Sequence, residues 1–377
     1  MKKVKILHCA DIHLDSPFKE LNKTISLKSK EELLETFKKV IDLVLLEKIE
    51  ILLIAGDFFD NMSLSKTTIN FIMNEFSRIK DTFIFISPGN HDPYNRKSFY
   101  KILTWPDNVY IFKGPMESVI IEKLNVIVWG CGFNEKYHKK TLLKNIKVNK
   151  QYINIVVMHG QVSSGNIANE YNPIYLEDTK NSGANYIALG HEHDFSDILK
   201  VGETHYCYCG CLSGRGFDEK GPKGVVLGNV YENSVDLKFV PLSKRKYIVK
   251  EIFLKNISTY EDIKKQILSS IKENERKQNI YKIILKGYVA EYFIINDSIL
   301  YEKLENEFYY IKLENKTNVE INLSEGSKDY SLKGKYILAV LEKLNQCTDD
   351  YEKEIVSLAL KLGIQCFTDE EVTVDDN

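Results

Sequence analysis

The stretch Val4-Lys5-Ile6-Leu7-His8-Cys9-Ala10-Asp11-Ile12-His13 decides the fold of this chain. Its first part, Val4–Cys9, is a short and mostly apolar run, which predicts a buried β-strand. The run ends just before Asp11 and His13, two side chains that can bind a metal ion. A buried strand followed directly by metal-binding side chains is typical of an α/β sheet, where ligand sites lie beyond the carboxyl ends of the strands.

Four later segments repeat this arrangement. We predict further buried strands at Ile51–Ala55, Phe83–Ser87, Ile155–Met158 and Tyr186–Leu189. Each strand is followed by glycine and by polar residues: Gly56-Asp57, Gly89-Asn90-His91-Asp92, His159-Gly160 and Gly190-His191-Glu192-His193. Together with His13 after the first strand, five of the chain's eight histidines follow or end a predicted strand. We therefore expect these polar groups to converge at one edge of the sheet structure.

Amphipathic segments lie between the first strands. Glu31–Lys48 and Ser65–Ile79 carry apolar residues at three-and-four spacing, which predicts helices with one buried face. The alternation of strand and helix predicts parallel pairing. Later runs at Val109–Phe112, Ser118–Ile121 and Val126–Trp129 follow one another without a helix, so we predict antiparallel strands there. The expected fold of residues 1–243 is α/β, a two-sheet β-sandwich flanked by helices.

The sequence pattern changes near Ser243. Residues 244–330 alternate between strand-like and helix-like segments and are predicted to form a small α+β capping domain. Residues 331–377 contain two helical segments, Lys335–Leu344 and Tyr351–Leu362, before an acidic end. We expect this tail to be a separate helical segment.

Bulk properties exclude several classes of protein. No run approaches the roughly 20 apolar residues that cross a bilayer, so we expect no membrane partner. Seven cysteines, an odd number at irregular spacing, argue against a disulfide framework and favour the cytoplasm. Cys207, Cys209 and Cys211 alternate along a predicted strand, and we interpret them as buried apolar residues rather than as a metal site. The net charge of −2 gives no overall basic surface for nucleic acid.

The ligand types at the strand ends indicate metal-dependent phosphoryl chemistry. Carboxylate, amide and imidazole groups without thiolates suit divalent ions such as Mn²⁺, with Fe²⁺ and Zn²⁺ as alternatives. Seven ligands are too many for one ion but fit two. Two ions held close together can stabilise both the attacking and the leaving oxygen of a phosphoester.

The series DxH, GDxxD, GNHD, H and GHxH, in this order over residues 11–193, resembles the signature of the calcineurin-like metallophosphoesterases. The resemblance implies a first metal site formed by Asp11, His13, Asp57 and His193. It implies a second site formed by Asp57, Asn90, His159 and His191, with Asp57 bridging. It also implies that His91 assists the leaving oxygen and that Asp60 orients His91 through a charge-assisted hydrogen bond.

Two stretches resemble the DNA repair exonucleases of the SbcD/YhaO type within this superfamily. They are Ala10–Phe18 and the later segment Gly210–Glu219. The resemblance implies a DNA substrate, a capping domain and a helical tail that docks on an SbcC-like ATPase partner; homodimerisation is left open. Arg215, in a glycine-flanked loop, is a candidate for contacting a substrate phosphate or for a structural salt bridge.

The predicted function is hydrolysis of DNA phosphodiester bonds by a two-metal phosphodiesterase, as an exonuclease or an endonuclease in DNA repair. One alternative is the same chemistry on small nucleotides or phosphoproteins. Phosphoprotein phosphatases of the superfamily usually carry Arg directly after the GDxxD block, whereas this chain has Asn61 there. An alternative of another class is a non-catalytic subunit that holds an ATPase or a DNA end.

Overall fold

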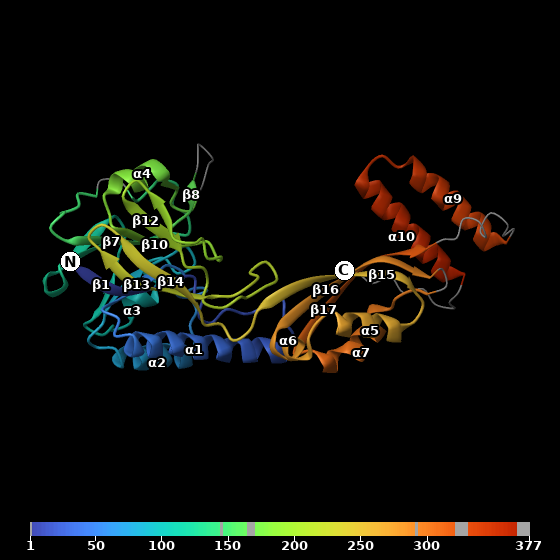
Figure 1. The fold of residues 1–377 in the computed structure, drawn as a ribbon, viewed down its shortest axis with the longest axis horizontal. Helices are drawn as coiled ribbons and strands as arrows, with labels where there is room; N and C mark the ends of the chain where they lie inside the picture. Colours follow the sequence, from blue (N-terminus) through green and yellow to red (C-terminus); the bar gives the residue numbers. More distant parts are fainter. Residues whose placement is uncertain (1, 144–145, 164–169, 291–292, 321–330, 368–377) are drawn as a thin grey trace. The chain divides into compact units, whose positions relative to one another are not determined.

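The computed structural model describes residues 2–143, 146–163, 170–290, 293–320 and 331–367 of the chain (Figure 1). The chain divides into two compact units, Met1–Lys246 and Tyr247–Asn377. The boundary lies three residues after the predicted one, and the segments 244–330 and 331–377 fall almost entirely in the second unit.

The first unit contains two six-stranded sheets. The first sheet has the order β14-β13-β1-β2-β3-β4. Its strands are β1 (Lys3–Cys9), β2 (Ile51–Ala55), β3 (Phe83–Ser87), β4 (Val109–Ile111), β13 (Gly224–Tyr231) and β14 (Val235–Pro241). Strands β1 to β4 pair in parallel, so β1, β2 and β3 end at the same edge of the sheet. The pairs β1–β13 and β13–β14 are antiparallel.

The second sheet has the order β11-β12-β10-β7-β6-β5. Its strands are β5 (Glu117–Ile121), β6 (Val126–Gly130), β7 (Ile153–His159), β10 (Tyr186–Gly190), β11 (Leu199–Val201) and β12 (Thr204–Tyr208). The four central strands are parallel, and the two edge strands are antiparallel to their neighbours. A short parallel pair, β8 (Val162–Ser163) and β9 (Ile174–Tyr175), lies outside both sheets.

One apolar core fills the space between the two sheets, because alternate residues of each strand point into it. Val4 and Ile6 enter this core from the first sheet, and Ile155 and Val157 enter it from the second. The opposite face of the second sheet buries Val156 and Met158 in a separate cluster. Both faces of β7 are thus apolar, as expected for a central parallel strand. This arrangement confirms the predicted two-sheet sandwich.

Helices complete the first unit. They are α1 (Lys23–Leu46), α2 (Lys66–Ser77), α3 (Phe99–Ile102), η1 (Glu122–Leu124) and α4 (Leu176–Ser182). In Figure 1, α1 and α2 lie side by side along one side of the sandwich, and α4 lies on the other. Helix α1 begins well before the predicted Glu31 because the Asn22 side chain caps it, accepting a hydrogen bond from the Ile25 N–H.

One strand assignment was wrong. The run at Val109 was predicted to be antiparallel, but β4 pairs in parallel with β3. The short helix α3, capped by Ser98, lies in the connection and makes the crossover. The predicted antiparallel pairing is confirmed for β5 and β6.

The second unit contains a three-stranded sheet in which all pairs are parallel. Its strands are β15 (Tyr247–Ile257), β16 (Ile280–Ala290) and β17 (Tyr310–Glu320). Its helices are α5 (Tyr260–Ser269), α6 (Glu273–Gln278), α7 (Asp297–Leu304), η2 (Glu305–Glu307), α9 (Leu332–Gln346) and α10 (Asp350–Cys366). Because strands alternate with helices, the expected α+β domain has α/β connectivity. Ile263 and Leu300 from the helices pack on Ile283 of the sheet.

Helices α9 and α10 form a hairpin with a small core of its own, made by Ile337, Leu360 and Ile364. Both helices extend beyond their predicted ends, and the acidic end of the chain lies outside the described residues. Within the described part of the chain, no helix combines the length and the apolar character that a bilayer crossing requires.

Candidate metal centre

The predicted ligands follow the ends of strands from both sheets. Asp11 and Asp57 follow β1 and β2, and Asn90 follows β3, in the first sheet. His159 ends β7, and His191 follows β10, in the second. These strands end at one edge of the sandwich, so the side chains converge as the sequence predicted.

The backbone takes an unusual conformation at four of these positions. The φ angles are 48° at Asp11, 50° at His13, 47° at Asp57 and 112° at His191. Positive φ costs energy in residues with a side chain and is concentrated at functional sites. Here hydrogen bonds from neighbouring segments hold it: the Asp11 N–H donates to Gly56 O, and the His13 N–H donates to Asp57 O. The loops after β1 and β2 therefore support each other.

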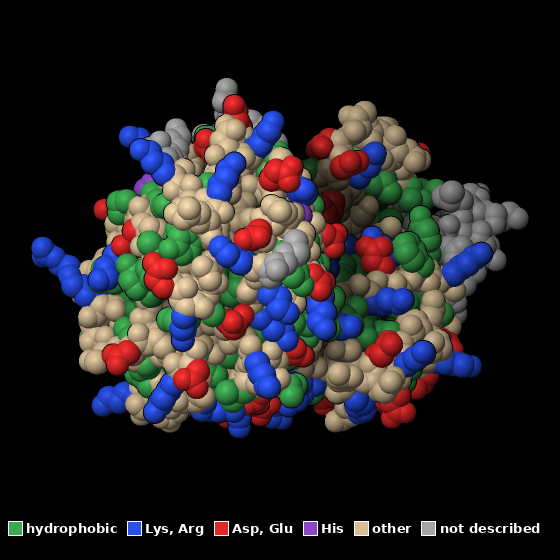
Figure 2. All heavy atoms as spheres, turned by 60° about the vertical axis from the view of Figure 1, so that its left-hand side comes forward, with side chains coloured by type: hydrophobic (Ala, Val, Ile, Leu, Met, Phe, Trp, Pro, Cys, Tyr) green, Lys and Arg blue, Asp and Glu red, His purple; other side chains and the backbone are tan. Residues whose placement is uncertain are grey.

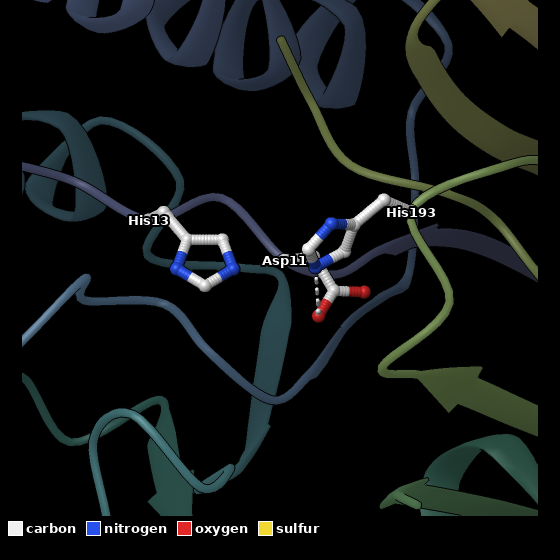
Figure 3. A group of neighbouring side chains, drawn as sticks. All are labelled: Asp11, His13 and His193. Carbon is white, nitrogen blue, oxygen red and sulfur yellow. Dashed lines mark ion pairs between the residues drawn. The ribbon is translucent and has the colours of Figure 1, made fainter. Parts of the chain in front are cut away.

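One group of candidate ligands consists of Asp11, His13 and His193, which offer atoms within 4.8 Å of one another. Figure 3 shows the His193 ring facing the Asp11 carboxylate, with the His13 ring beside them. The distance from His193 Nε2 to Asp11 Oδ1 is 3.9 Å. His13 is fully buried, and neither of its ring nitrogens makes a hydrogen bond among the described residues, although the Asp60 and Asp57 carboxylates lie 3.4 Å from Nδ1 and 3.8 Å from Nε2. A buried imidazole without hydrogen bonds is costly, and a cation beside Nε2 would satisfy that nitrogen.

A second group consists of Asp11, Asp57 and His159. The Nδ1–H of a neutral His159 donates to the carbonyl of Ala55 at 3.1 Å, which leaves Nε2 unprotonated. That Nε2 faces Asn90 Oδ1 at 2.9 Å and Asp57 Oδ2 at 3.5 Å. Three electron-pair donors that face one another form a fitting site for a divalent cation. Asp57 lies between the two groups, since its Oδ2 is also 3.8 Å from His13 Nε2.

His191 lies beside these groups without belonging to one of the close clusters described above. Its ring centroid is 5.2 Å from that of His159 and 5.0 Å from that of Tyr171. Its main-chain N–H donates to both oxygens of Asp11, at 2.9 and 3.1 Å. The structure therefore connects His191 to the second group, while its role as a ligand stays a prediction.

Burial and neighbouring charges shift the pKa values of several of these side chains. Burial lowers the pKa of His13 to about 4 and that of His191 to about 4, so both rings are neutral near pH 7. Burial raises the pKa of Asp11 to about 6, opposed by the nearby histidines. Burial also acts to raise the pKa of Asp57, but His159 and His13 outweigh it and hold that pKa below its ordinary value. Neutral imidazoles beside buried carboxylates are what a divalent metal ion requires.

The contact between His91 and Asp60 differs from the prediction. His91 Nδ1 lies 3.0 Å from the main-chain carbonyl of Asp60, not from its carboxylate. The carboxylate turns away, with Oδ1 at 3.4 Å from His13 Nδ1 and 3.2 Å from Arg215 Nη1. The carbonyl fixes the orientation of the exposed His91 ring, but the expected charge-assisted bond is absent from this pair. His13, Asp60 and His91 do form a third close group, in which the Arg215 guanidinium already supplies positive charge.

Glu219 and Asp92 were not predicted as site residues. Glu219 is buried and its Oε1 lies 2.8 Å from His193 Nδ1. Asp92, the last residue of the GNHD block, is buried and accepts hydrogen bonds from the N–H groups of Phe59 and Gly89 and from the Tyr100 hydroxyl. Asp92 thereby fixes the turn that carries Asn90 and His91. For Asp92, its place in the GNHD block was the available signal. For Glu219, the signal was its place in the segment Gly210–Glu219, which carries the family resemblance but gives no spacing rule relative to His193.

Two further predictions concern Arg215 and the three alternating cysteines. Arg215 makes a salt bridge to Glu219 at 2.6 Å as well as to Asp60, which favours the structural alternative over a phosphate contact. Cys207, Cys209 and Cys211 are buried, unpaired as disulfides, and absent from the candidate metal groups of the described residues. Burial raises the pKa of the Cys207 thiol to about 12, which agrees with an apolar role.

The comparison with known families decides the assignment. The sequence profile described as calcineurin-like phosphoesterase matches residues 4–195, which contain every strand end of the site. This chain belongs to the calcineurin-like phosphoesterase family. It is therefore a metal-dependent hydrolase of phosphoester bonds, as the ligand set predicted.

Two known proteins are similar in sequence to this calcineurin-like phosphoesterase. The metallophosphoesterase YhaO of Bacillus subtilis is 29% identical over 245 residues, covering 62% of this chain and 59% of YhaO. The DNA double-strand break repair protein Mre11 of Saccharolobus solfataricus is 26% identical over 340 residues, covering 80% of this chain and 82% of Mre11. The chain thus matches less than two thirds of the length of YhaO.

Proposed function

We propose that this phosphoesterase hydrolyses phosphodiester bonds of DNA with the help of two divalent ions. The observation that carries the proposal is the pair of buried carboxylates, Asp11 and Asp57, flanked by imidazoles whose free nitrogens face them. Two bound ions, with Mn²⁺ expected and Fe²⁺ or Zn²⁺ as alternatives, would supply Lewis-acid charge to a phosphate. The similarity to a DNA repair protein over 80% of the chain supports DNA as the substrate.

Different residues would bind the metal ions and donate the proton to the leaving oxygen. The predicted ligands would hold the ions: Asp11, His13, Asp57, Asn90, His159, His191 and His193. The exposed His91 lies at the rim, with its Nδ1 hydrogen-bonded to the Asp60 carbonyl. This bond orients the ring and leaves Nε2 as the atom that can release a proton to the leaving oxygen.

The distribution of charged side chains on the surface bears on how DNA would bind. On the face that Figure 2 shows, Lys and Arg side chains are interspersed with Asp and Glu. Lys244 and Arg245, two neighbouring basic residues near the end of the first unit, both pair with Glu32. We infer that bound metal ions, rather than a continuous basic stripe, supply most of the charge that attracts phosphate to the site.

An exposed apolar face on the helical hairpin supports the proposal of an ATPase partner. On α10, Tyr351, Ile355 and Leu358 are spaced by about one helical turn and are 71%, 50% and 54% exposed. An exposed apolar stripe of this kind fits a partner helix. We propose it as the docking face for an SbcC-like ATPase.

Hydrolysis of two substrates tests the proposed chemistry. End-labelled linear DNA and bis-p-nitrophenyl phosphate are incubated with Mn²⁺ and with wild-type, Asp57→Ala or His91→Ala protein. Asp57→Ala should reduce both activities to background. His91→Ala should slow DNA cleavage about 100-fold or more. It should spare most of the model-ester activity, since p-nitrophenolate leaves without a proton.

The remaining outcomes discriminate among the alternatives. Model-ester hydrolysis without DNA cleavage, even with the ATPase present, would favour a small-nucleotide or phosphoprotein substrate. Absence of both activities in the metal-loaded wild type would favour a non-catalytic subunit.

A further inference from the structure

Charged side chains lie near the Nδ1 atoms of His13 and His193, whereas the Nε2 atoms of these rings face Asp57 and Asp11. Glu219 Oε1 lies 2.8 Å from His193 Nδ1, and Asp60 Oδ1 lies 3.4 Å from His13 Nδ1. Each ring of the first metal group thus has a carboxylate at Nδ1. The other nitrogen of each ring faces a metal-binding carboxylate, Asp11 for His193 and Asp57 for His13.

Arg215 connects these two outer carboxylates. Its Nη1 lies 3.2 Å from Asp60 Oδ1, and its Nη2 lies 2.6 Å from Glu219 Oε1. Its Nε and its main-chain N–H donate to Glu219 as well, at 3.1 and 2.7 Å. A guanidinium can span two carboxylates in this way because its N–H groups are fixed in a planar fork, whereas the ammonium of lysine is a single point.

The connection is well shielded from water. The side chains of Arg215 and Asp60 are each 16% exposed, and that of Glu219 is 6% exposed. Breaking a buried charge network leaves an unpaired charge, so its members hold their positions strictly. The N–H groups of Arg215 are occupied by protein carboxylates, which leaves the residue poorly suited to bind a substrate phosphate.

We propose that Arg215 and Glu219 are positioning residues that fix the orientation and separation of the His13 and His193 rings for one divalent ion. His193 Nδ1 lies 2.8 Å from Glu219 Oε1 and 3.3 Å from Arg215 Nη2; a proton on Nδ1 is directed at the closer carboxylate, which leaves Nε2 unprotonated and directed at Asp11. Arg215 holds Glu219 and Asp60 at a fixed distance, and through them the two rings. Groups that orient metal-binding histidines typically change metal affinity 10- to 100-fold when removed. The inference rests on the proposed metal site.

Metal binding measured directly tests this role. Mn²⁺ is titrated calorimetrically into chelator-treated, full-length wild-type, Glu219→Gln, Arg215→Lys and Glu192→Gln proteins. Glu219→Gln keeps the size of the side chain but removes its charge, and should weaken one of two Mn²⁺ sites about 10- to 100-fold while sparing the other. Arg215→Lys should act in the same direction. Glu192→Gln is the matched control, because exposed Glu192 lies between His191 and His193 in sequence; its affinities should stay within about twofold of wild type.

The outcomes separate this inference from the proposed site itself. Unchanged Mn²⁺ affinities in Glu219→Gln, with wild type binding two ions, would overturn the positioning role alone. An equal loss in Glu192→Gln would also overturn it, since net charge would then explain the effect. A wild type that binds no Mn²⁺ overturns the site and the inference together. If Arg215→Lys does not fold, as judged by circular dichroism, the isosteric Glu219→Gln decides the question.

Discussion

At the scale of single residues, Gly56 determines whether Asp57 and His159 can occupy their places. Gly56 has φ of +90°, and a Cβ atom built on it would lie 2.1 Å from His159 Nδ1. Gly221 has a similar φ of +82° but no atom within 4 Å of such a Cβ. Gly221→Ala should cost about 1–2 kcal/mol of stability through backbone strain. Gly56→Ala should cost clearly more and also abolish hydrolysis, as measured by thermal unfolding and model-ester assay. Equal effects of the two substitutions would contradict the role of the His159 contact.

Some individual residues of the site could be predicted from the sequence, and others could not. Asp11, Asp57 and His159 were found from sequence because strand ends in an α/β sheet are forced to one edge. The direction of the Asp60 carboxylate could not be found, since His13 and Arg215 compete with His91 for it and only packing decides. Glu219 was missed because its loop returns to His193 from a distant part of the chain.

At the scale of elements, α10 presents two faces with different expected roles. Ile355 and Leu358 are exposed, whereas Leu360 is 7% exposed and packs in the core of the hairpin. The double substitution Ile355→Gln/Leu358→Gln should leave the free energy of unfolding within about 0.5 kcal/mol of wild type, because it changes only surface. It should abolish co-elution with a soluble SbcC-like ATPase in gel filtration. Leu360→Glu, the control, should cost about 3 kcal/mol or more by burying a charge. Co-elution that survives the double substitution would rule out this docking face.

The bounds of strands were predicted correctly where apolar runs were continuous, whereas strand pairing and a helix start were predicted wrongly near connecting segments. Strands β2 and β3 match their predicted bounds because both are continuous apolar runs closed by turns. The pairing of β4 was wrong because a four-residue helix, α3, is too short to give a periodic signal. The start of α1 depends on the Asn22 cap, a local hydrogen bond that precedes the strongly periodic part of the helix.

At the scale of the whole molecule, the two compact units have separate apolar cores and should unfold in separate steps. Differential scanning calorimetry of the chelated protein should then show two transitions. Only the first unit carries the candidate ligands, so Mn²⁺ should raise one transition and leave the other in place. At a free concentration of about 100 times Kd, one site adds about 2.7 kcal/mol to stability. For a unit of this size, that corresponds to roughly 5–10 °C.

The variant Asp57→Asn distinguishes specific binding from a general effect of the salt. It keeps the shape of the side chain but removes the charge of a carboxylate that belongs to the group of Asp11 and His159 and lies 3.8 Å from His13 Nε2, so its Mn²⁺-dependent shift should vanish. The transition that does not respond in wild type should stay at the same temperature in the variant. A shift that persists in Asp57→Asn, or one that moves both transitions together, would mean that Mn²⁺ stabilises the protein from somewhere other than this centre.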